Sequence, residues 1–344
     1  MKKYLSLTFL TALSLVLTAC GGDSSDEGNS DAQSESNGEN IKIIAAHNQT
    51  SAENPYQDGL LKFKEVAEEE SDGQIEVEVH AGTIGTEESE LVEKLGTGAA
   101  DVVLVSPGFM TSTGIREVDL FALPYLFEDY DHWESVVDGE VGDQLAEIIN
   151  DKSNNEFRML GYWSAGPRHY YGKEPLESID DLNGVSIRTQ TSGVVSDFWQ
   201  QTGAVPTSVA WGELYQGLQQ NVVDSAENSY PYFVQQNHHT TPNGKHITET
   251  AHDYTTRFLL TNGNSFDQYP EDIQEILLNA AEESVITERE SVMAQDEEYK
   301  EIAIEDGAEV HEIDTTEFQE IARPIQDDLA EELDLTDALE QIRN

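Results

Sequence analysis

The chain has 344 residues, of which 25% are charged, with 18 Lys and Arg against 68 Asp and Glu. This length predicts two globular lobes of ordinary size. The formal net charge of -50 repels phosphate groups, so it argues against general nucleic-acid binding and against attachment to an anionic bilayer through a basic patch. The excess of acid favours an exposed protein in a salty or alkaline environment.

The N-terminal residues have the layout of a bacterial export signal. Lys2 and Lys3 precede the uncharged stretch 4–19, which is shorter than the roughly 20 residues that span a bilayer. The stretch runs into Leu-Thr-Ala-Cys-Gly, which resembles the lipobox of bacterial lipoproteins. We therefore expect residues 1–19 to be a lipoprotein signal peptide and Cys20 to carry a diacylglyceryl group. An uncleaved anchor helix with an incidental cysteine is the alternative.

Residues 20–40 consist almost entirely of Gly, Ser, Asp, Glu, Asn and Gln, so we expect a flexible acidic tether. Cys20 is the only cysteine, which excludes an intramolecular disulfide. Anchor, tether and folded body together predict an extracytoplasmic protein held at the cell membrane by its lipid. The outer face of a single-membrane bacterium is favoured, and the periplasm of a two-membrane cell is the alternative.

The body begins with alternating strand and helix patterns. Strands are expected at 41–45, 75–79 and 101–105, and helices at about 58–70 and around 91–95. The third strand is a continuous apolar run of the kind found in buried parallel strands. This alternation predicts a sheet with helices on its faces.

The same rhythm resumes further along the chain. Strands are expected at 157–162, 185–188 and 255–261, a short extended piece at 204–206, and helices at 196–201 and 212–220. From 271 to about 305 the apolar residues keep helical spacing with no internal Pro or Gly. That pattern predicts one helix long enough to run across two lobes.

The most specific motifs lie between residues 166 and 253. Residues 180–188 read DDLNGVSIR, residues 203–206 read GAVP, and residues 212–228 read GELYQGLQQNVVDSAEN. This stretch resembles the solute-binding proteins of TRAP transporters, the DctP family, and the resemblance covers the body from about residue 41 to the C-terminus. Asn221 and Ser225 replace two glycines of the family pattern, which affects turn geometry more than ligand chemistry.

The resemblance implies an α/β fold of the two-lobed periplasmic-binding-protein type, a Venus flytrap with hinge strands and a long lobe-spanning helix. We expect lobe I to comprise 41–165 and about 253–292, and lobe II to comprise 166–252 and about 293–344. The lobes would close over a solute by hinge motion and deliver it to the membrane permease of a sodium-driven TRAP system. The protein is then expected to have no catalytic residues and no cofactor.

Arg188 is the expected clamp for a carboxylate. Its guanidinium presents a planar fork of donors that fits a carboxylate in a bidentate way. It ends a predicted strand beside a Thr-, Gln- and Ser-rich loop, which is where α/β folds place ligands. From the residues alone a structural ion pair is the competing interpretation. The resemblance assigns Arg188 the salt bridge to the ligand's carboxylate.

The resemblance also makes Arg168 and Asn228 candidate ligand contacts. A loop ion pair is the alternative for Arg168, and Glu227 could contact the ligand or hold Arg188 in place. Candidates for a sugar's hydroxyls and apolar face are His47, Asn48, Glu87, Glu88, Trp163, Phe198 and Trp211, each of which could equally be a loop, surface or core residue.

The ligand class follows from smaller features. Residues 227–230, 238–239 and 251–254 look like the subgroup that binds sugar acids such as glucuronate and galacturonate. A hexuronate-type sugar acid is therefore the favoured solute. A C4-dicarboxylate is the alternative, and it would need a second cationic clamp, which Arg168 could supply.

Other classes of protein fit the sequence less well. His238, His239, His246 and His252 match no compact zinc motif, so we expect a solvated loop and no metal site. A surface glycosidase would need paired acids, which chance supplies in so acidic a chain. No Gly-x-Ser-x-Gly elbow, phosphate loop or His-Glu-x-x-His motif is present.

Overall fold

The computed structural model describes residues 40–110, 113–189 and 193–344. The predicted signal peptide, Cys20 and the tether up to residue 39 lie outside these described residues. The described elements all belong to one compact unit, Glu39–Asn344. Across the described ranges, no helix is both long and apolar enough to cross a membrane.

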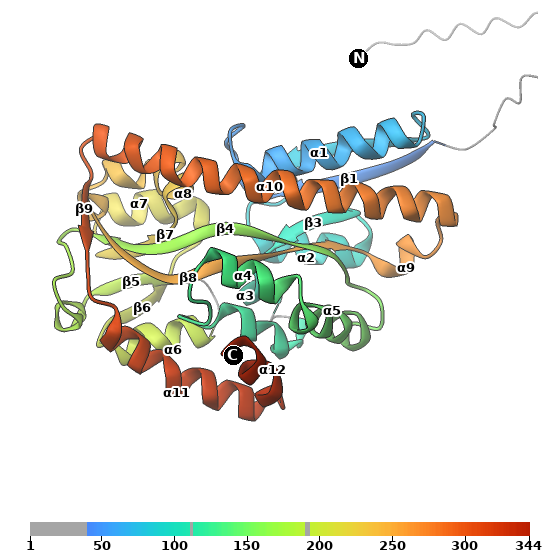
Figure 1. Cartoon of the computed structure of the whole chain (residues 1–344). Coiled ribbons are helices and arrows are strands. Elements are labelled where there is room, and N and C mark those ends of the chain that lie inside the picture. Colours follow the sequence, from blue (N-terminus) through green and yellow to red (C-terminus); the bar gives the residue numbers. More distant parts are fainter. Residues whose placement is uncertain (1–39, 111–112, 190–192) are drawn as a thin grey trace, which may run out of the picture. The chain divides into compact units, whose positions relative to one another are not determined.

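Within this unit the described strands form one mixed sheet in the order β2-β1-β3-β8-β4-β7-β5-β6, with β9 paired to β8 (Figure 1). The strands are β1 (Ile41–His47), β2 (Ile75–Ala81), β3 (Val102–Val105), β4 (Arg158–Gly172), β5 (Ser186–Thr189), β6 (Val205–Ser208), β7 (Ser225–Asn228), β8 (His246–Thr261) and β9 (Glu309–Glu312). A parallel group, β2-β1-β3, stands at one end of the sheet, and a second parallel group, β7-β5-β6, stands at the other.

Two long strands join these groups. β4 has 15 residues and β8 has 16, and they pair antiparallel through the middle of the sheet. Their register shifts at three places, between Met159 and Gly161, between Ser164 and Pro167, and between Arg168 and Tyr170. Gly166 in β4 and Ala251 in β8 both adopt positive φ, at 76° and 41°. Two of the shifts and both positive-φ residues thus lie close to the predicted lobe boundaries, 165/166 and about 252/253.

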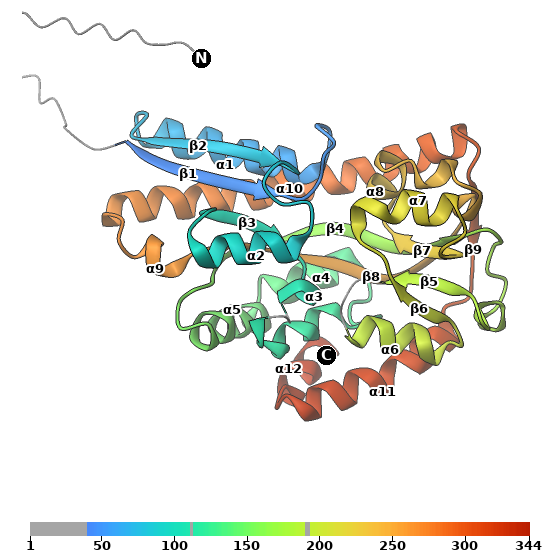
Figure 2. The ribbon, with the colours of Figure 1, turned by 180° about the vertical axis from the view of Figure 1, so that it is seen from behind.

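Helices cover both faces of the sheet (Figures 1 and 2). They are α1 (Pro55–Glu70), α2 (Glu88–Thr97), α3 (Pro107–Met110), α4 (Tyr130–Val137), α5 (Glu140–Lys152), α6 (Gly193–Gln201), α7 (Leu214–Gln219), α8 (Tyr230–Gln235), α9 (Gly263–Phe266), α10 (Glu271–Glu305), α11 (Thr316–Glu332) and α12 (Thr336–Ile342). Short 3₁₀ helices lie at Arg116–Ala122, Ile179–Leu182, Trp211–Glu213, His238–Thr240 and Pro242–Gly244. The predicted long helix is confirmed as α10, which contacts α1 near one group of strands and α8 near the other.

The apolar side chains form three buried clusters. One joins β1 and α1 to the first half of α10, and another joins β4, β7 and α8 near the other end of the sheet. The largest includes Phe318 of α11 and Leu339 of α12 together with residues of both strand groups. α11 contacts α6 and the 3₁₀ helix Arg116–Ala122, while α12 contacts α5. The C-terminal helices thus touch both groups, and the lobe boundaries stay a prediction.

Candidate functional site

A small pocket lies where the carboxyl ends of β1, β5 and β7 meet the middle of β8. The described residues that line it are Asn48, Gln49, Glu88, Phe109, Arg188, Trp211, Asn228, Tyr232 and Arg257. Its volume of about 20 Å³ is room for about one water molecule. The pocket is polar, and its lining comes from both parallel groups of strands.

Arg188 reaches this pocket from the end of β5. It is only 3% exposed, its Nε donates to the carbonyl oxygen of Val209 at 3.0 Å, and its guanidinium carbon lies 5.6 Å from the centre of the Trp211 ring. No described carboxylate is in ion-pair contact with it, and its two terminal nitrogens donate to no described residue. Burial lowers the pKa of Arg188, as expected for a cation that lacks a direct counter-charge. The fork of the guanidinium is thus available to an anion.

Arg168 lies behind the pocket, and all three of its guanidinium nitrogens donate hydrogen bonds to other residues. Its guanidinium binds both carboxylate oxygens of Glu227, with Nη2 2.8 Å from Oε1, and Nη1 donates to Asn228 Oδ1 at 3.1 Å. His252 Nε2 lies 3.3 Å from Glu227 Oε2. Burial alone would raise the pKa of Glu227, but Arg168 and His252 outweigh it and lower the pKa to about 2. Glu227 is therefore ionised and neutralises Arg168.

A second cation, Arg257, enters the pocket from β8. Its Nε donates to the Tyr56 hydroxyl at 2.5 Å, and its Nη2 lies 3.9 Å from Glu88 Oε1. Nη1 is buried and has no hydrogen-bond partner among the described residues. The other oxygen of Glu88 accepts from the backbone nitrogen and the hydroxyl of Ser106, at 2.6 and 2.7 Å. Unlike Arg188, Arg257 has a carboxylate close by.

Glu87 connects the two sides of the pocket. It precedes α2 beside the first group of strands, and its Oε1 accepts from the backbone nitrogen of Trp211, near the second group, at 3.1 Å. Burial raises the pKa of Glu87. This bond closes one rim of the pocket.

The structure brings together four of the seven predicted binding residues, namely Arg188, Asn228, Asn48 and Trp211, as lining of the pocket. The lining does not include Arg168 or Glu227, which lie behind Asn228, nor Glu87, which holds Trp211 at the rim. Among the weaker candidates Glu88 lines the pocket. His47, Trp163 and Phe198 are buried elsewhere, and Trp163 and Phe198 belong to apolar clusters.

The sequence reasoning missed Gln49, Phe109, Tyr232 and Arg257. A signal existed for Arg257, because it is the only charge within the predicted strand 255–261. A cation inside an otherwise uncharged strand either has a buried partner or faces a polar cavity. Gln49 follows the end of β1, and Phe109 and Tyr232 lie within the short helices α3 and α8, so nothing in their neighbourhood distinguishes them from core or loop residues.

The expectation of a solvated histidine loop is wrong for three of the four histidines. His238, His239 and His252 are at most 7% exposed. His238 bonds the Tyr171 hydroxyl at 2.8 Å, His239 bonds Asp306 at 3.2 Å, and His252 joins the Arg168–Glu227 pair. They are buried because each side chain finds a polar partner. His246 lies apart, in a cluster at the start of β8.

Comparison with known proteins identifies relatives over nearly the whole body. The model of the DctP family, described as bacterial extracellular solute-binding protein, family 7, matches residues 45–333. The C4-dicarboxylate-binding periplasmic protein DctP of Rhodobacter capsulatus is 30% identical over 297 residues, which cover 85% of this chain and 87% of that protein.

Solved structures agree with this result. A TRAP periplasmic solute-binding protein from Sulfitobacter sp. NAS-14.1 with bound β-D-galacturonate is 25% identical, with a TM-score of 0.82 over 88% of this chain and 99% of that one. A TRAP periplasmic solute-binding protein from Citrobacter koseri with bound D-glucuronate is 28% identical, with the same TM-score and coverage. The predicted two-lobed α/β fold is confirmed.

Proposed function

The chain belongs to family 7 of the bacterial extracellular solute-binding proteins, the DctP family, and we propose that its pocket captures a hexuronate-type sugar acid through Arg188. The family binds solutes for transport, so the protein acts by capture and not by catalysis. The loaded protein then delivers its solute to the permease subunits of a TRAP transporter in the membrane.

The observation that carries this proposal is the open guanidinium fork of Arg188. A buried cation with no ion-pair partner among the described residues costs free energy, and a carboxylate that meets the fork with two charge-assisted hydrogen bonds recovers it. The pocket excludes bulk water, which strengthens the attraction between the two charges. One carboxylate of the solute therefore binds Arg188.

The rest of the pocket suits hydroxyl groups. Asn48, Gln49 and Asn228 each offer both a donor and an acceptor, while Tyr232 adds a hydroxyl and Trp211 an aromatic ring. Glu88 can accept from sugar hydroxyls, and it repels a second carboxylate. These features favour a monocarboxylate with several hydroxyls, the chemistry of the galacturonate and glucuronate bound by the two structural relatives.

Capture requires a conformational change, because the pocket in this structure has room for about one water molecule. We infer that the two lobes open at the irregular hinge of β4 and β8 and close over the solute. The bond from Trp211 to Glu87 would form on closure and break on opening.

We infer that the protein acts outside the cytoplasm and is anchored there by lipid on Cys20. The extracytoplasmic location agrees with the description of the family. The anchor rests on the sequence alone, from the small residues and the cysteine that follow the apolar stretch.

A C4-dicarboxylate is the second candidate solute. The R. capsulatus relative is a C4-dicarboxylate-binding protein, and the pocket does hold a second cation, Arg257, whose Nη1 has no hydrogen-bond partner among the described residues. In that case the second clamp would be Arg257 and not Arg168, whose donors are already used. A glycosidase is disfavoured because Glu88 is the only carboxylate among the described lining residues, whereas the reaction needs two.

The proposal is tested by thermal unfolding of the purified protein with glucuronate, galacturonate, succinate, malate and gluconate in turn. A solute at about a thousand times its Kd adds roughly 4 kcal/mol of stability, which shifts the Tm by several degrees. We expect a shift with a uronate and none with succinate. A shift with succinate or malate alone would transfer the assignment to dicarboxylates, and the absence of a shift with every acid would overturn the role of Arg188.

A further inference from the structure

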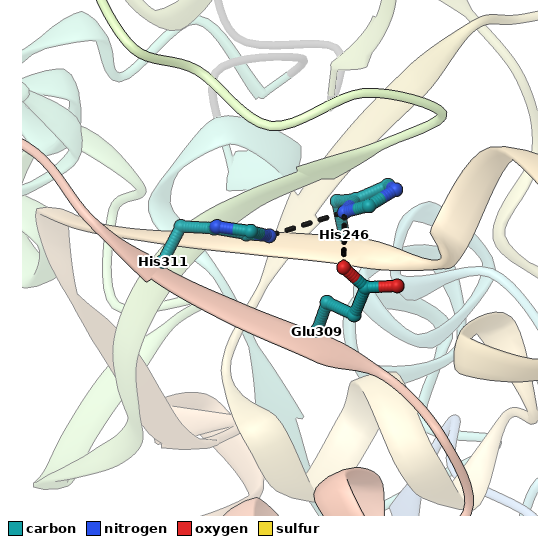
Figure 3. Close-up of side chains that lie close together, drawn as sticks. All are labelled: His246, Glu309 and His311. Carbon is teal, nitrogen blue, oxygen red and sulfur yellow. Dashed lines mark hydrogen bonds and ion pairs between the residues drawn. The ribbon is translucent and has the colours of Figure 1, made fainter.

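Three metal-ligating side chains meet at the end of the sheet that carries β9. Figure 3 shows His246, Glu309 and His311 pointing toward one another. His246 begins β8, and the other two residues lie on β9, the short strand between α10 and α11. None of the three lines the pocket described above.

The strand pairing explains why these side chains converge. β9 runs parallel to β8 with His246 opposite Glu309 and Thr248 opposite His311. Glu309 and His311 are two residues apart, so their side chains stand on the same face of β9. His246 is the neighbour of Glu309 on the adjacent strand, and all three donors therefore share one face of a two-strand ladder.

The distances suit a single ion. His246 Nδ1 lies 3.1 Å from His311 Nε2 and 3.7 Å from Glu309 Oε2, and the three donor atoms are all within 4.8 Å of one another. Zinc binds imidazole nitrogen at about 2.0–2.1 Å and carboxylate oxygen at about 2.0–2.2 Å, so adjacent donors of one ion are roughly 3–3.5 Å apart. Small side-chain rotations would bring all three into that range.

The neighbouring charges prepare the carboxylate for this role. Lys245 Nζ binds Glu309 Oε1 at 2.7 Å, which leaves Oε2 facing the histidines. This ion pair favours the charged form of the carboxylate, which is the form that binds a cation. A lysine that orients a ligating carboxylate in this way acts as an outer-shell partner.

We propose that His246, Glu309 and His311 form a binding site for one divalent transition-metal ion of the zinc class. Two imidazoles and one carboxylate are ligands that zinc, nickel and copper prefer, whereas magnesium and calcium favour oxygen ligands alone. The ion would fasten β9, and with it the connection from α10 to α11, onto β8. This inference does not depend on the identity of the solute.

The test uses the full-length protein in detergent, purified without a polyhistidine tag and stripped with a chelator. Zinc binding is followed by calorimetry, with magnesium and calcium at the same concentration to measure general attraction to the acidic surface. We expect one saturable zinc site that magnesium and calcium do not occupy, and a rise in Tm of a few degrees at zinc concentrations about a hundred times the Kd.

His246→Gln, His311→Gln and Glu309→Gln are compared with His80→Gln. His80 is a suitable control because its Nε2 lies 3.7 Å from Glu78 Oε2, a histidine–carboxylate pair of the same separation but outside the cluster. We expect about tenfold or greater loss of zinc affinity in each cluster variant and none in the control. Cys20 is present in every variant, so binding by its thiol would be equal in all four.

Unchanged zinc affinity in both His311→Gln and Glu309→Gln would overturn the proposal, and so would the lack of any saturable zinc site. Glu309 is exposed, so its variant is the one least able to disturb the fold. Solute affinity measured in parallel identifies any variant that has lost its structure.

Discussion

Arg168 lies on β4 and Arg188 on β5, and these two strands both pair with β7, one on each side. The two arginines are buried to the same degree, 2% and 3% exposed. Arg168 has its fork filled by Glu227, whereas the terminal nitrogens of Arg188 donate to no described residue. Burial alone therefore does not distinguish these two arginines. What distinguishes them is a carboxylate partner, which Arg168 has and which Arg188 lacks among the described residues.

The largest effect that we expect is a loss of folding stability when Arg168 is replaced. Arg168→Met leaves the carboxylate of Glu227 buried without its main partner, which costs about 3–5 kcal/mol of folding stability. Urea unfolding monitored by fluorescence measures the loss. Arg323→Met, at an exposed position, is the control and should change little. If Arg168→Met kept full stability and lost only solute affinity, Arg168 would be a ligand contact, and the proposed difference in role between Arg168 and Arg188 would be wrong.

Replacement of Arg188 should have the opposite result, a loss of solute affinity without a loss of folding stability. Arg188→Ala removes the partner of the solute's carboxylate and should weaken binding by about 2–5 kcal/mol, while folding stability stays the same or rises. Arg188→Lys keeps the charge but not the planar fork, so it should recover only part of the affinity. Calorimetry with the solute that stabilises the wild type measures both. Wild-type affinity in a folded Arg188→Ala protein would contradict the clamp.

The contrast between these two arginines could not be predicted from the sequence. Both are followed by polar residues, and the resemblance to TRAP solute-binding proteins suggested binding for each. What separates them is the side chain of Glu227, which points from β7 toward β4 rather than toward β5. The direction of the Glu227 side chain depends on the pairing of three strands that are distant in the sequence, so local sequence patterns do not predict it.

The fold was more predictable, because its elements have strong local periodicity. The long helix was expected from 271 to about 305 and is Glu271–Glu305. The predicted strands at 157–162 and 255–261 are parts of β4 and β8, which extend much further, to Gly172 and back to His246. Gly166, Pro167 and several polar residues interrupt the apolar pattern there, and sheet pairing overrides it.

Two buried carboxyl groups, those of Glu288 and Glu227, should respond to pH in opposite ways. Burial raises the pKa of Glu288 from its usual 4.5 to about 8, because among the described residues only the backbone nitrogen of Ser164 donates a hydrogen bond to its carboxyl oxygens. Glu227, beside Arg168, has its pKa lowered to about 2. The stability due to Glu227 is therefore present above pH 4.5 and lost as the pH falls toward 2. The stability due to protonated Glu288 is present below pH 4.5 and lost as the pH rises through 8.

Glu288→Gln separates these two contributions. Glutamine keeps the shape without the ionisable proton, so the variant should lose less stability than the wild type between pH 5 and 8.5. The difference has a slope of up to about 1.4 kcal/mol per pH unit. Urea unfolding at four or five pH values measures it. Parallel curves for the two proteins across this range would show that Glu288 is ionised in the folded state.

The smallest expected effect concerns the rim that faces Arg188. Glu87→Ala removes the acceptor of the Trp211 backbone nitrogen, whereas Glu87→Gln keeps an amide oxygen there. A single hydrogen bond of this kind is worth about 1 kcal/mol, and we propose that it forms only when the lobes close. Glu87→Ala should therefore weaken solute binding about fivefold, mainly through faster dissociation, and Glu87→Gln should weaken it less. Stopped-flow release of the bound solute distinguishes the two variants. If both bound as weakly as Arg188→Ala, Glu87 would contact the solute itself, and its place at the rim of the pocket would be wrong.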